Sequence, residues 1–351
     1  MKAWLLFICW IPTVGYTQSQ NDPIEAVIQE INYGEDTLRA VFDWVANTIE
    51  YDVALLGMKR PYASEDEIVA QALDRKKGIC QHYASLFNEL VQRLGYESHV
   101  VIGYTIQEDI VNDEISHAWN AVRVRDNWYF FDPTWSSGYV DNHQFFKHYD
   151  DVWYMVPPEE FIRSHIPFDP IWQLTPHPLT HRAVQEGNFS ATLDHSFSFE
   201  DSLAAQLNQD TLTNLRSSIR RINEFGLANQ LIRERVDVLN QQTIIIEHNQ
   251  AVATLNGVVV DFNRYIAAKN RRFRRPKMSD EELKDVSSSL TERVDAAYAA
   301  FNATVATPSL SIQQLQENRN VTENARQRIY EERAFIERYL STWKLFRIFT
   351  Y

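Results

Sequence analysis

The sequence has 351 residues, a net charge of −13 and 44% hydrophobic residues. Its length suggests two domains, and its apolar content is sufficient for sizeable cores. The negative charge argues against a general nucleic-acid-binding protein and against a protein that binds anionic membrane surfaces.

The N-terminus predicts a secretory signal peptide over residues 1–18. Lys2 is followed by an apolar run over residues 3–11 and by polar residues 17–20, and the apolar run is shorter than a typical membrane span. The alternative is an N-terminal membrane anchor. With the signal removed, the protein is expected to be secreted or periplasmic, and Cys80 is the one cysteine left. An unpaired thiol in an oxidising compartment must be buried or have a chemical role.

Four helices are predicted before residue 96. The first runs from about residue 22 to residue 31, the second from 35 to 50, and the third begins after Ser64 as N-cap. The fourth follows Gly78, because apolar residues recur at steps of three and four and Gly95 then suits a left-handed helix end. The apolar face of this fourth helix consists of Ala84, Phe87, Leu90, Val91 and Leu94.

Cys80 falls at the N-terminus of this fourth helix. Free N–H groups and the helix dipole stabilise a thiolate there, and the same N–H groups can hold an oxyanion. The alternative is a buried structural cysteine.

Three strands are predicted next, at residues 98–104, 117–124 and 128–132, with an acidic loop at 109–116. Helices followed by an antiparallel hairpin give an α+β domain.

The register of the last hairpin decides whether His117 meets Asp132. A two-residue turn at Arg125-Asp126 makes His117 the same-face diagonal neighbour of Asp132, within side-chain reach. A turn at Asp126-Asn127 separates the two residues, and Asn127 is the better left-handed turn residue. A bulge could also set the register. We predict the arrangement that joins His117 to Asp132.

The remaining chain divides by composition. Residues 133–180 are rich in proline and aromatic residues and are expected to wrap the first domain, which spans 22–180. Residues 181–197 are predicted to be a linker, and residues 198–351 an all-α domain, interpreted as a helical bundle. The run 269–275 is strongly basic, which fits either a site for an acidic partner or a solvated helix end.

Cys80, His117 and Asp132 together supply the roles of a catalytic triad. A thiol attacks a carbonyl as thiolate, and a histidine accepts its proton and later donates one to the leaving group. A carboxylate on the other ring nitrogen fixes the tautomer and stabilises the imidazolium. Taken separately, His117 fits a structural histidine and Asp132 a strand terminator.

Three blocks of sequence resemble the signature blocks of the transglutaminase-like superfamily, which has a papain-like fold. They are Gly78-Ile79-Cys80-Gln81-His82-Tyr83-Ala84, His117-Ala118-Trp119-Asn120-Ala121-Val122 and Asp132-Pro133-Thr134-Trp135. Tyr154–Ile162 and Ile171–Leu174 are similar to the branch that contains the kyphoscoliosis peptidase.

The resemblance covers roughly residues 35–175. It implies that Cys80 is the nucleophile, His117 the base and Asp132 the residue that orients the base. Gln81 follows the cysteine, where animal transglutaminases have tryptophan. No acidic cluster has the spacing of a calcium loop. Both departures argue against calcium-dependent cross-linking.

We therefore expect a cysteine-dependent hydrolase or acyltransferase that acts on peptide or side-chain amides through a thioester, with peptidase activity favoured. The alternative is a non-catalytic extracellular scaffold that binds peptide through its cleft and another protein through its helical domain. No cofactor is expected, and no metal, because HExxH and paired CxxC spacings are absent from the sequence. His82, His99, His143, His148, His165, His177 and His181 are interpreted as surface or packing residues. The expected partner is a protein or peptide substrate.

Overall fold

The computed structural model describes residues 22–57, 64–189 and 198–350. The predicted signal peptide therefore lies outside the described residues. Within the described part, the chain forms two compact units, one of residues 22–179 and 183–189 and one of residues 180–182 and 198–350. A short helix, α7 (His181–Gln185), lies in the range where the sequence predicts a linker.

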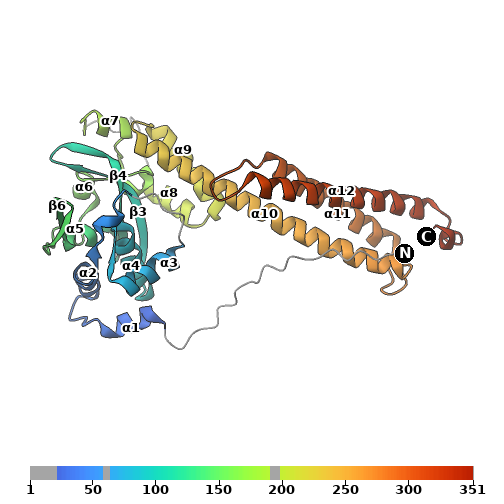
Figure 1. Cartoon of the computed structure of the whole chain (residues 1–351), viewed down its shortest axis with the longest axis horizontal. Helices are drawn as coiled ribbons and strands as arrows, with labels where there is room; N and C mark the ends of the chain where they lie inside the picture. The colour runs from blue at the N-terminus through green and yellow to red at the C-terminus, as the bar shows by residue number, and fades with distance from the viewer. Residues whose placement is uncertain (1–21, 58–63, 190–197, 351) are drawn as a thin grey trace. The chain divides into compact units, whose positions relative to one another are not determined.

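The first unit is α+β, as predicted, with helices and an antiparallel sheet (Figure 1). Its elements in chain order are α1 (Pro23–Glu30), α2 (Thr37–Thr48), β1 (Glu50–Tyr51), η1 (Val53–Leu55), α3 (Glu65–Arg75), β2 (Lys77–Gly78), α4 (Cys80–Arg93), β3 (Glu97–Gln107), β4 (Ile110–Val124), β5 (Asn127–Phe131), α5 (Pro133–Ser137), β6 (Gly138–Asp141), β7 (Gln144–Lys147), α6 (Pro158–Phe161), β8 (His165–Pro167) and η2 (Pro170–Gln173).

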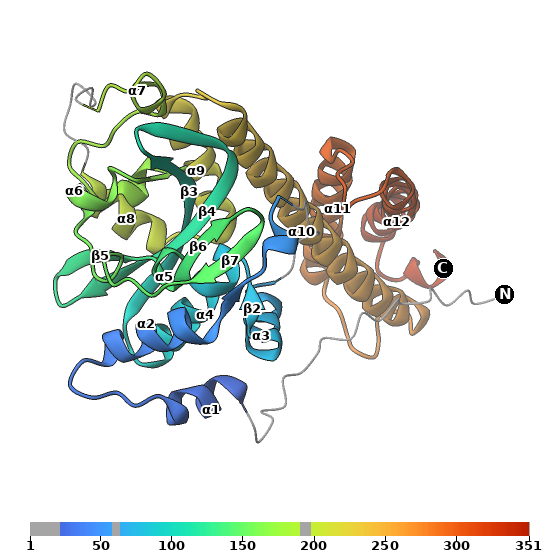
Figure 2. The same ribbon diagram turned by 60° about the vertical axis from the view of Figure 1, so that its left-hand side comes forward.

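The main sheet has the strand order β5-β4-β3-β8, and every neighbouring pair is antiparallel. Helix α4 packs against β3 and β4 (Figure 2). The core of this unit joins α1 to α4 with β4 and β5. Its largest fully buried members include Phe42, Phe87 and Phe131, whose rings contact one another.

The acidic loop predicted at residues 109–116 is wrong. Residues 110–116 belong to β4, which starts at Ile110. Ile110, Val111 and Asn112 pair with the end of β3, and the pairing resumes at His117 after a register shift. The chain reverses in a two-residue turn at Glu108 and Asp109, both of which have positive φ. A tight turn of this kind lets the strands pair up to its edge, so the exposed acidic residues lie on a projecting hairpin.

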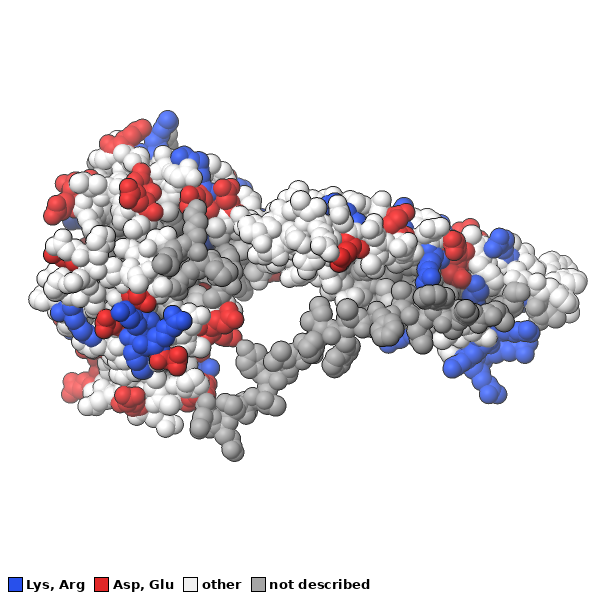
Figure 3. Space-filling model, in the orientation of Figure 1, with Lys and Arg blue, Asp and Glu red and all other residues white. Residues whose placement is uncertain are grey.

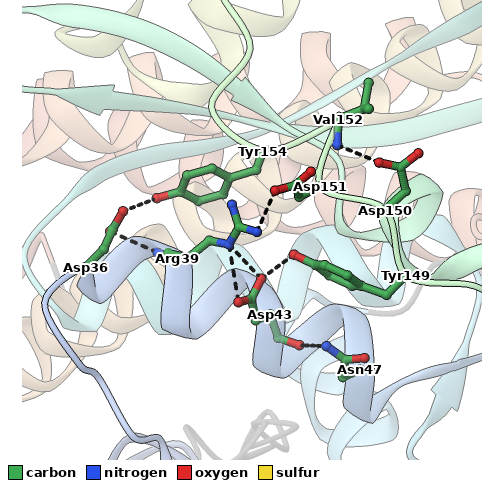
Figure 4. A network of polar contacts seen from close by, with 9 residues as sticks. All are labelled: Asp36, Arg39, Asp43, Asn47, Tyr149, Asp150, Asp151, Val152 and Tyr154. Carbon is green, nitrogen blue, oxygen red and sulfur yellow. Dashed lines mark hydrogen bonds and ion pairs between the residues drawn. The ribbon is translucent and has the colours of Figure 1, made fainter.

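Polar contacts fix the segment 149–154 to helix α2 (Figure 4). The guanidinium of Arg39 donates to Asp151 over 2.8 Å, and the hydroxyl of Tyr154 donates to Asp36 over 2.9 Å. Part of the Pro- and aromatic-rich region thus lies against the first helices. The same segment carries the backbone carbonyl that anchors Asp132, described below.

The second unit is helical. It contains α8 (Phe199–Leu207), α9 (Thr211–Phe225), α10 (Gln230–Asn270), α11 (Asp280–Ala303), α12 (Ile312–Ser341) and the short η3 (Arg347–Phe349). Helix α11 packs against both α10 and α12 (Figure 2). The side chains of Ser279 and Ser311 cap the N-termini of α11 and α12. No helix within the described ranges has the length and apolar character needed to span a bilayer.

Candidate active site

Cys80 is the first residue of α4, as the sequence predicts. The helix start is closed by His82, whose Nδ1 accepts the backbone N–H of Ile79 over 3.2 Å. The His82 ring lies directly against Gly78, where an added Cβ would come within 2.5 Å of it. Glycine at 78 is therefore required by this close approach. The Gly-Ile-Cys-Gln-His stretch folds as one unit that presents Cys80 at the helix N-terminus.

Tyr51 is held next to the nucleophile by a short parallel ladder. Tyr51 pairs with Gly78, and the N–H of Asp52 donates to the Gly78 carbonyl over 2.8 Å. The Tyr51 ring lies 6.1 Å from that of Phe145 and 6.5 Å from that of Tyr83. Within the described residues, its hydroxyl has no hydrogen-bond partner. The hydroxyl is therefore available to a ligand.

The hairpin of β4 and β5 brings His117 to Asp132 in the predicted register. Val124 pairs with Asn127, so the turn is Arg125-Asp126, with Arg125 at a φ of 58°. His117 Nε2 lies 2.7 Å from Asp132 Oδ2. Because Nε2 is engaged, Nδ1 is the ring nitrogen left for another partner.

Asp132 is a completely buried carboxylate with four hydrogen-bond partners. Its Oδ1 accepts the N–H groups of Thr134 and Trp135, at 2.9 and 3.1 Å, so Asp132 is also the N-cap of α5. Its own N–H donates to the Trp153 carbonyl over 3.0 Å, which fixes it to the segment that contacts α2. Burial opposes the charged form, but His117, and then His165, outweigh it and hold the pKa of Asp132 well below its ordinary value.

The partner histidine is charged as a result. Burial by itself lowers the pKa of His117, but the charge and hydrogen bond of Asp132, with a further contribution from Cys80, raise it to about 10. His117 and Asp132 therefore form a buried imidazolium–carboxylate pair at neutral pH.

His165 is a site residue that the sequence analysis treated as a surface or packing histidine. It is fully buried, its ring stacks on Phe161 at 4.0 Å, and its Nε2 lies 3.2 Å from Asp132 Oδ2. Burial lowers its pKa to about 4, so the ring is neutral. A carboxylate only accepts hydrogen bonds, so Nε2 carries the proton and Nδ1 accepts from the Ser164 hydroxyl, 2.8 Å away. Asp132 is thus held between a charged and a neutral histidine.

Cys80 completes the group from the other side. Its thiol is close enough to the His117 ring to contribute to the raised pKa of that histidine, and it packs with Ala84 and Ala118. Both Cys80 and His117 are 9% exposed. The three predicted residues therefore converge, with the thiol nearly buried.

A cavity of about 490 Å³ opens above this group. His117, Tyr51 and Trp135 form part of its wall, whereas Cys80 is not among the residues that line it. The rim includes Tyr139 of β6, which is 55% exposed. Of the two tryptophans near the hairpin, Trp135 borders the cavity, and Trp119 is fully buried against His117 and Phe161.

His117, Asp132 and His165 also form a group of potential metal ligands, because their ligand atoms lie within 4.8 Å of one another. The distances between the ring nitrogens and Oδ2 are those of hydrogen bonds, and each Nε2 uses its proton for that bond. A metal would need both nitrogens deprotonated and turned away from the carboxylate. The contacts fit a proton-carrying site better than a metal centre.

Sequence comparison finds a family match within the first unit. The sequence model of the transglutaminase-like superfamily matches residues 24–133, a range that includes Cys80, His117 and Asp132. Residues 24–133 form a transglutaminase-like domain. This domain has a papain-like combination of helices and antiparallel sheet. The helical unit follows it in the chain.

The chain is similar to several larger proteins. Kyphoscoliosis peptidase from Mus musculus is 28% identical over 226 residues, which cover 62% of this chain and 32% of the relative. The Lim and transglutaminase domain protein ltd-1 from Caenorhabditis elegans is 26% identical over 41% of this chain and 22% of the relative. Hillarin from Drosophila melanogaster is 24% identical over 44% and 20%. The chain thus matches a third or less of the length of each of these relatives.

Proposed function

We propose that the transglutaminase-like domain is a cysteine-dependent enzyme that acts on peptide or side-chain amides, with hydrolysis favoured over amine transfer. The observation that supports this most directly is the buried His117–Asp132 pair, which reaches the thiol of Cys80 at a helix N-terminus. Two further features agree with it: a cavity borders His117, and one similar protein is named a peptidase.

In the first step, the sulfur of Cys80 attacks the amide carbonyl as a thiolate, and its proton resides on Nδ1 of His117. The new C–S bond forms as the carbonyl electrons move onto oxygen. When the C–N bond breaks, His117 donates the proton to the departing amine. A thioester at Cys80 and a free amine result.

In the second step, water or a second amine attacks the thioester. His117 accepts a proton from this nucleophile and Cys80 leaves as thiolate. Gln81 next to the nucleophile, in place of the tryptophan of animal transglutaminases, is our reason to favour water. Asp132 keeps the proton of Nε2 in place throughout, so that Nδ1 alone exchanges protons.

The oxyanion of the tetrahedral intermediate would be held by the backbone N–H of Cys80 and the hydroxyl of Tyr51. Helix N-terminal N–H groups lack intrahelical acceptors. Burial, and then the nearby Cys80, raise the pKa of Tyr51, so its phenol stays protonated and can donate. The cavity wall that Tyr51 shares with His117 is where a carbonyl oxygen would enter.

The proposed substrate is a protein or peptide. The cavity is bordered by apolar residues of β6 and β7 and by polar residues of the β3–β4 hairpin, such as Gln107 and Asn112. Backbone amides and mixed side chains suit such a wall.

We also propose that the protein is secreted after removal of residues 1–18. N-terminal sequencing of the mature protein tests this, and an intact N-terminus would contradict it.

A non-catalytic scaffold is the competing function, and one observation favours it: Cys80 is nearly buried and does not line the cavity. A scaffold would bind peptide in the cavity and a second protein on the helical unit. To separate the two, the full chain and its Cys80→Ala variant are incubated with a proteome-derived peptide library, with and without a primary amine. The enzyme produces new peptide termini, deamidated side chains or amine adducts with wild type only. Peptides captured equally by both proteins without chemical change would support the scaffold.

A further inference from the structure

One end of the helical unit carries an unusually basic turn between α10 and α11. Residues 271–277, here called the basic turn, contain Arg271, Arg272, Arg274, Arg275 and Lys277 and no acidic residue. All five of these side chains are exposed. Figure 3 shows the blue side chains gathered at this end of the unit. This local charge runs against the net charge of −13 of the whole chain.

Large apolar side chains protrude at the same end. Residues 343–349, here called the apolar tail, follow α12 and include Trp343, Leu345 and Phe349, which are 77%, 78% and 78% exposed. No other large apolar side chain in the described part of the chain exceeds 70%. Phe346 adds a further exposed ring, at 57%. Such a concentration of exposed apolar area marks an interaction surface.

An ion pair holds the apolar tail against the start of α11, directly after the basic turn. Arg347 forms a bidentate pair with Asp280 at the start of α11, at 2.6 and 3.0 Å, and its Nε donates to the Thr342 carbonyl over 3.0 Å. A hollow of about 360 Å³ is lined by both segments, including Arg274, Lys277 and Lys344. The two segments therefore make one continuous surface, although they are far apart in sequence.

Most of the positive charge on this surface is available to a ligand. Arg347 is neutralised by Asp280, and Lys269 at the end of α10 by Glu332. Within the described residues, Arg271, Arg274, Arg275, Lys277 and Lys344 form no ion pair. Of the acidic residues that open α11, Glu282 is engaged as a cap by the N–H of Ser279.

We propose that this end of the helical unit docks onto anionic membrane surfaces. Arginine and lysine attract acidic headgroups, and tryptophan, leucine and phenylalanine insert at the level of the headgroups. An acidic protein would satisfy the charges, but it would leave exposed apolar side chains of this size without a hydrocarbon environment. The negative net charge argues against such binding, but it is a sum over the whole chain. Electrostatic attraction is screened beyond about 8 Å, so the positive charge of this surface acts locally on a membrane.

The test measures flotation of the full chain with vesicles of phosphatidylcholine alone or with about 30% phosphatidylserine. Since a basic residue near such a surface contributes about fivefold in binding, Arg271→Ala/Arg274→Ala/Arg275→Ala should weaken binding on the order of 100-fold. Trp343→Ala/Phe349→Ala, which leaves the charge unchanged, should weaken it about tenfold. Binding should also fall as salt is raised.

The matched control is Arg216→Ala/Arg220→Ala/Arg264→Ala, which removes the same charge from exposed arginines elsewhere on the helical unit. The control should bind vesicles like wild type. Any contribution of the N-terminal segment to vesicle binding is the same in all variants. Equal losses in the control and the basic-turn variant would overturn the proposal, as would failure of wild type to float with acidic vesicles. Another outcome is that the chain binds an acidic polypeptide equally well with and without the Trp343→Ala/Phe349→Ala substitutions and does not bind vesicles. That outcome would assign the surface to a protein partner instead.

Discussion

Replacing Asp132 by asparagine tests how the site sets the charge of His117. The asparagine side chain has nearly the same shape as aspartate, and its oxygen can still accept the N–H groups of Thr134 and Trp135. Its amide N–H₂ would then face His117 Nε2 across the present 2.7 Å contact. Nε2 must accept this bond, so the ring proton moves to Nδ1, the nitrogen that should receive the proton of Cys80.

The expected magnitude follows from the environment of the ring. Asp132 raises the pKa of His117 to about 10, and burial alone works in the opposite direction. Asp132→Asn should therefore move the ring titration from about 10 to below 6.5, a change on the order of 5 kcal/mol between the two protonation states. In serine triads the corresponding substitution lowers kcat about 10⁴-fold through the wrong tautomer.

The assay is an NMR titration of the histidine ring nitrogens in wild type, Asp132→Asn and the control His165→Gln, which can still donate to Asp132. His117 should titrate near 10 in wild type and below 6.5 in Asp132→Asn, and it should stay high in the control. An unchanged titration in Asp132→Asn would refute the electrostatic role assigned to Asp132.

Three further outcomes are expected. Tyr51→Phe should slow acylation of Cys80 by p-nitrophenyl acetate about 100-fold, because an oxyanion donor is lost. It should leave alkylation by iodoacetamide unchanged, because alkylation forms no oxyanion. Equal effects on both reactions would exclude an oxyanion role. Gly78→Ala should lower the free energy of unfolding in urea by about 2 kcal/mol, because the new Cβ overlaps the ring of His82, and an unchanged midpoint would contradict the packing argument. The folded-state pKa of His165, about 4, lies below its unfolded value, so its contribution to stability is present above pH 6.5 and is lost as pH falls toward 4. His165→Phe should therefore make the unfolding free energy less dependent on pH in this range, and a slope equal to that of wild type would show that His165 is not the titrating group.

The Cys80 helix could be predicted because its signals are local. Gly78 permits the close packing of His82, apolar residues recur at helical spacing, and Gly95 has the left-handed conformation, with a φ of 90°. The hairpin register was less strongly specified, since Asn127 is a good turn residue. Tertiary pairing placed the turn at Arg125-Asp126 instead, with Arg125 in the left-handed region.

Other features depend on contacts between distant residues and leave no local signal. His165 lies on a three-residue strand that pairs with β3, far earlier in the chain, so its approach to Asp132 cannot be read from its neighbours. The sequence predicts a loop at residues 109–116 because both faces of a projecting hairpin can carry polar residues. The basic turn is evident in the sequence, but the apolar tail beside it becomes evident only when Arg347 is seen to pair with Asp280.

The most direct measurement of the central proposal is the rate of Cys80 alkylation by iodoacetamide as a function of pH, in wild type and His117→Ala. The His117 imidazolium next to the thiol should accelerate the alkylation of Cys80 at mildly acidic pH, and this acceleration should disappear in the variant while the fold is retained. A wild-type profile like that of a free thiol, or no reaction until the protein is denatured, would contradict a catalytic Cys80–His117 pair and favour the scaffold.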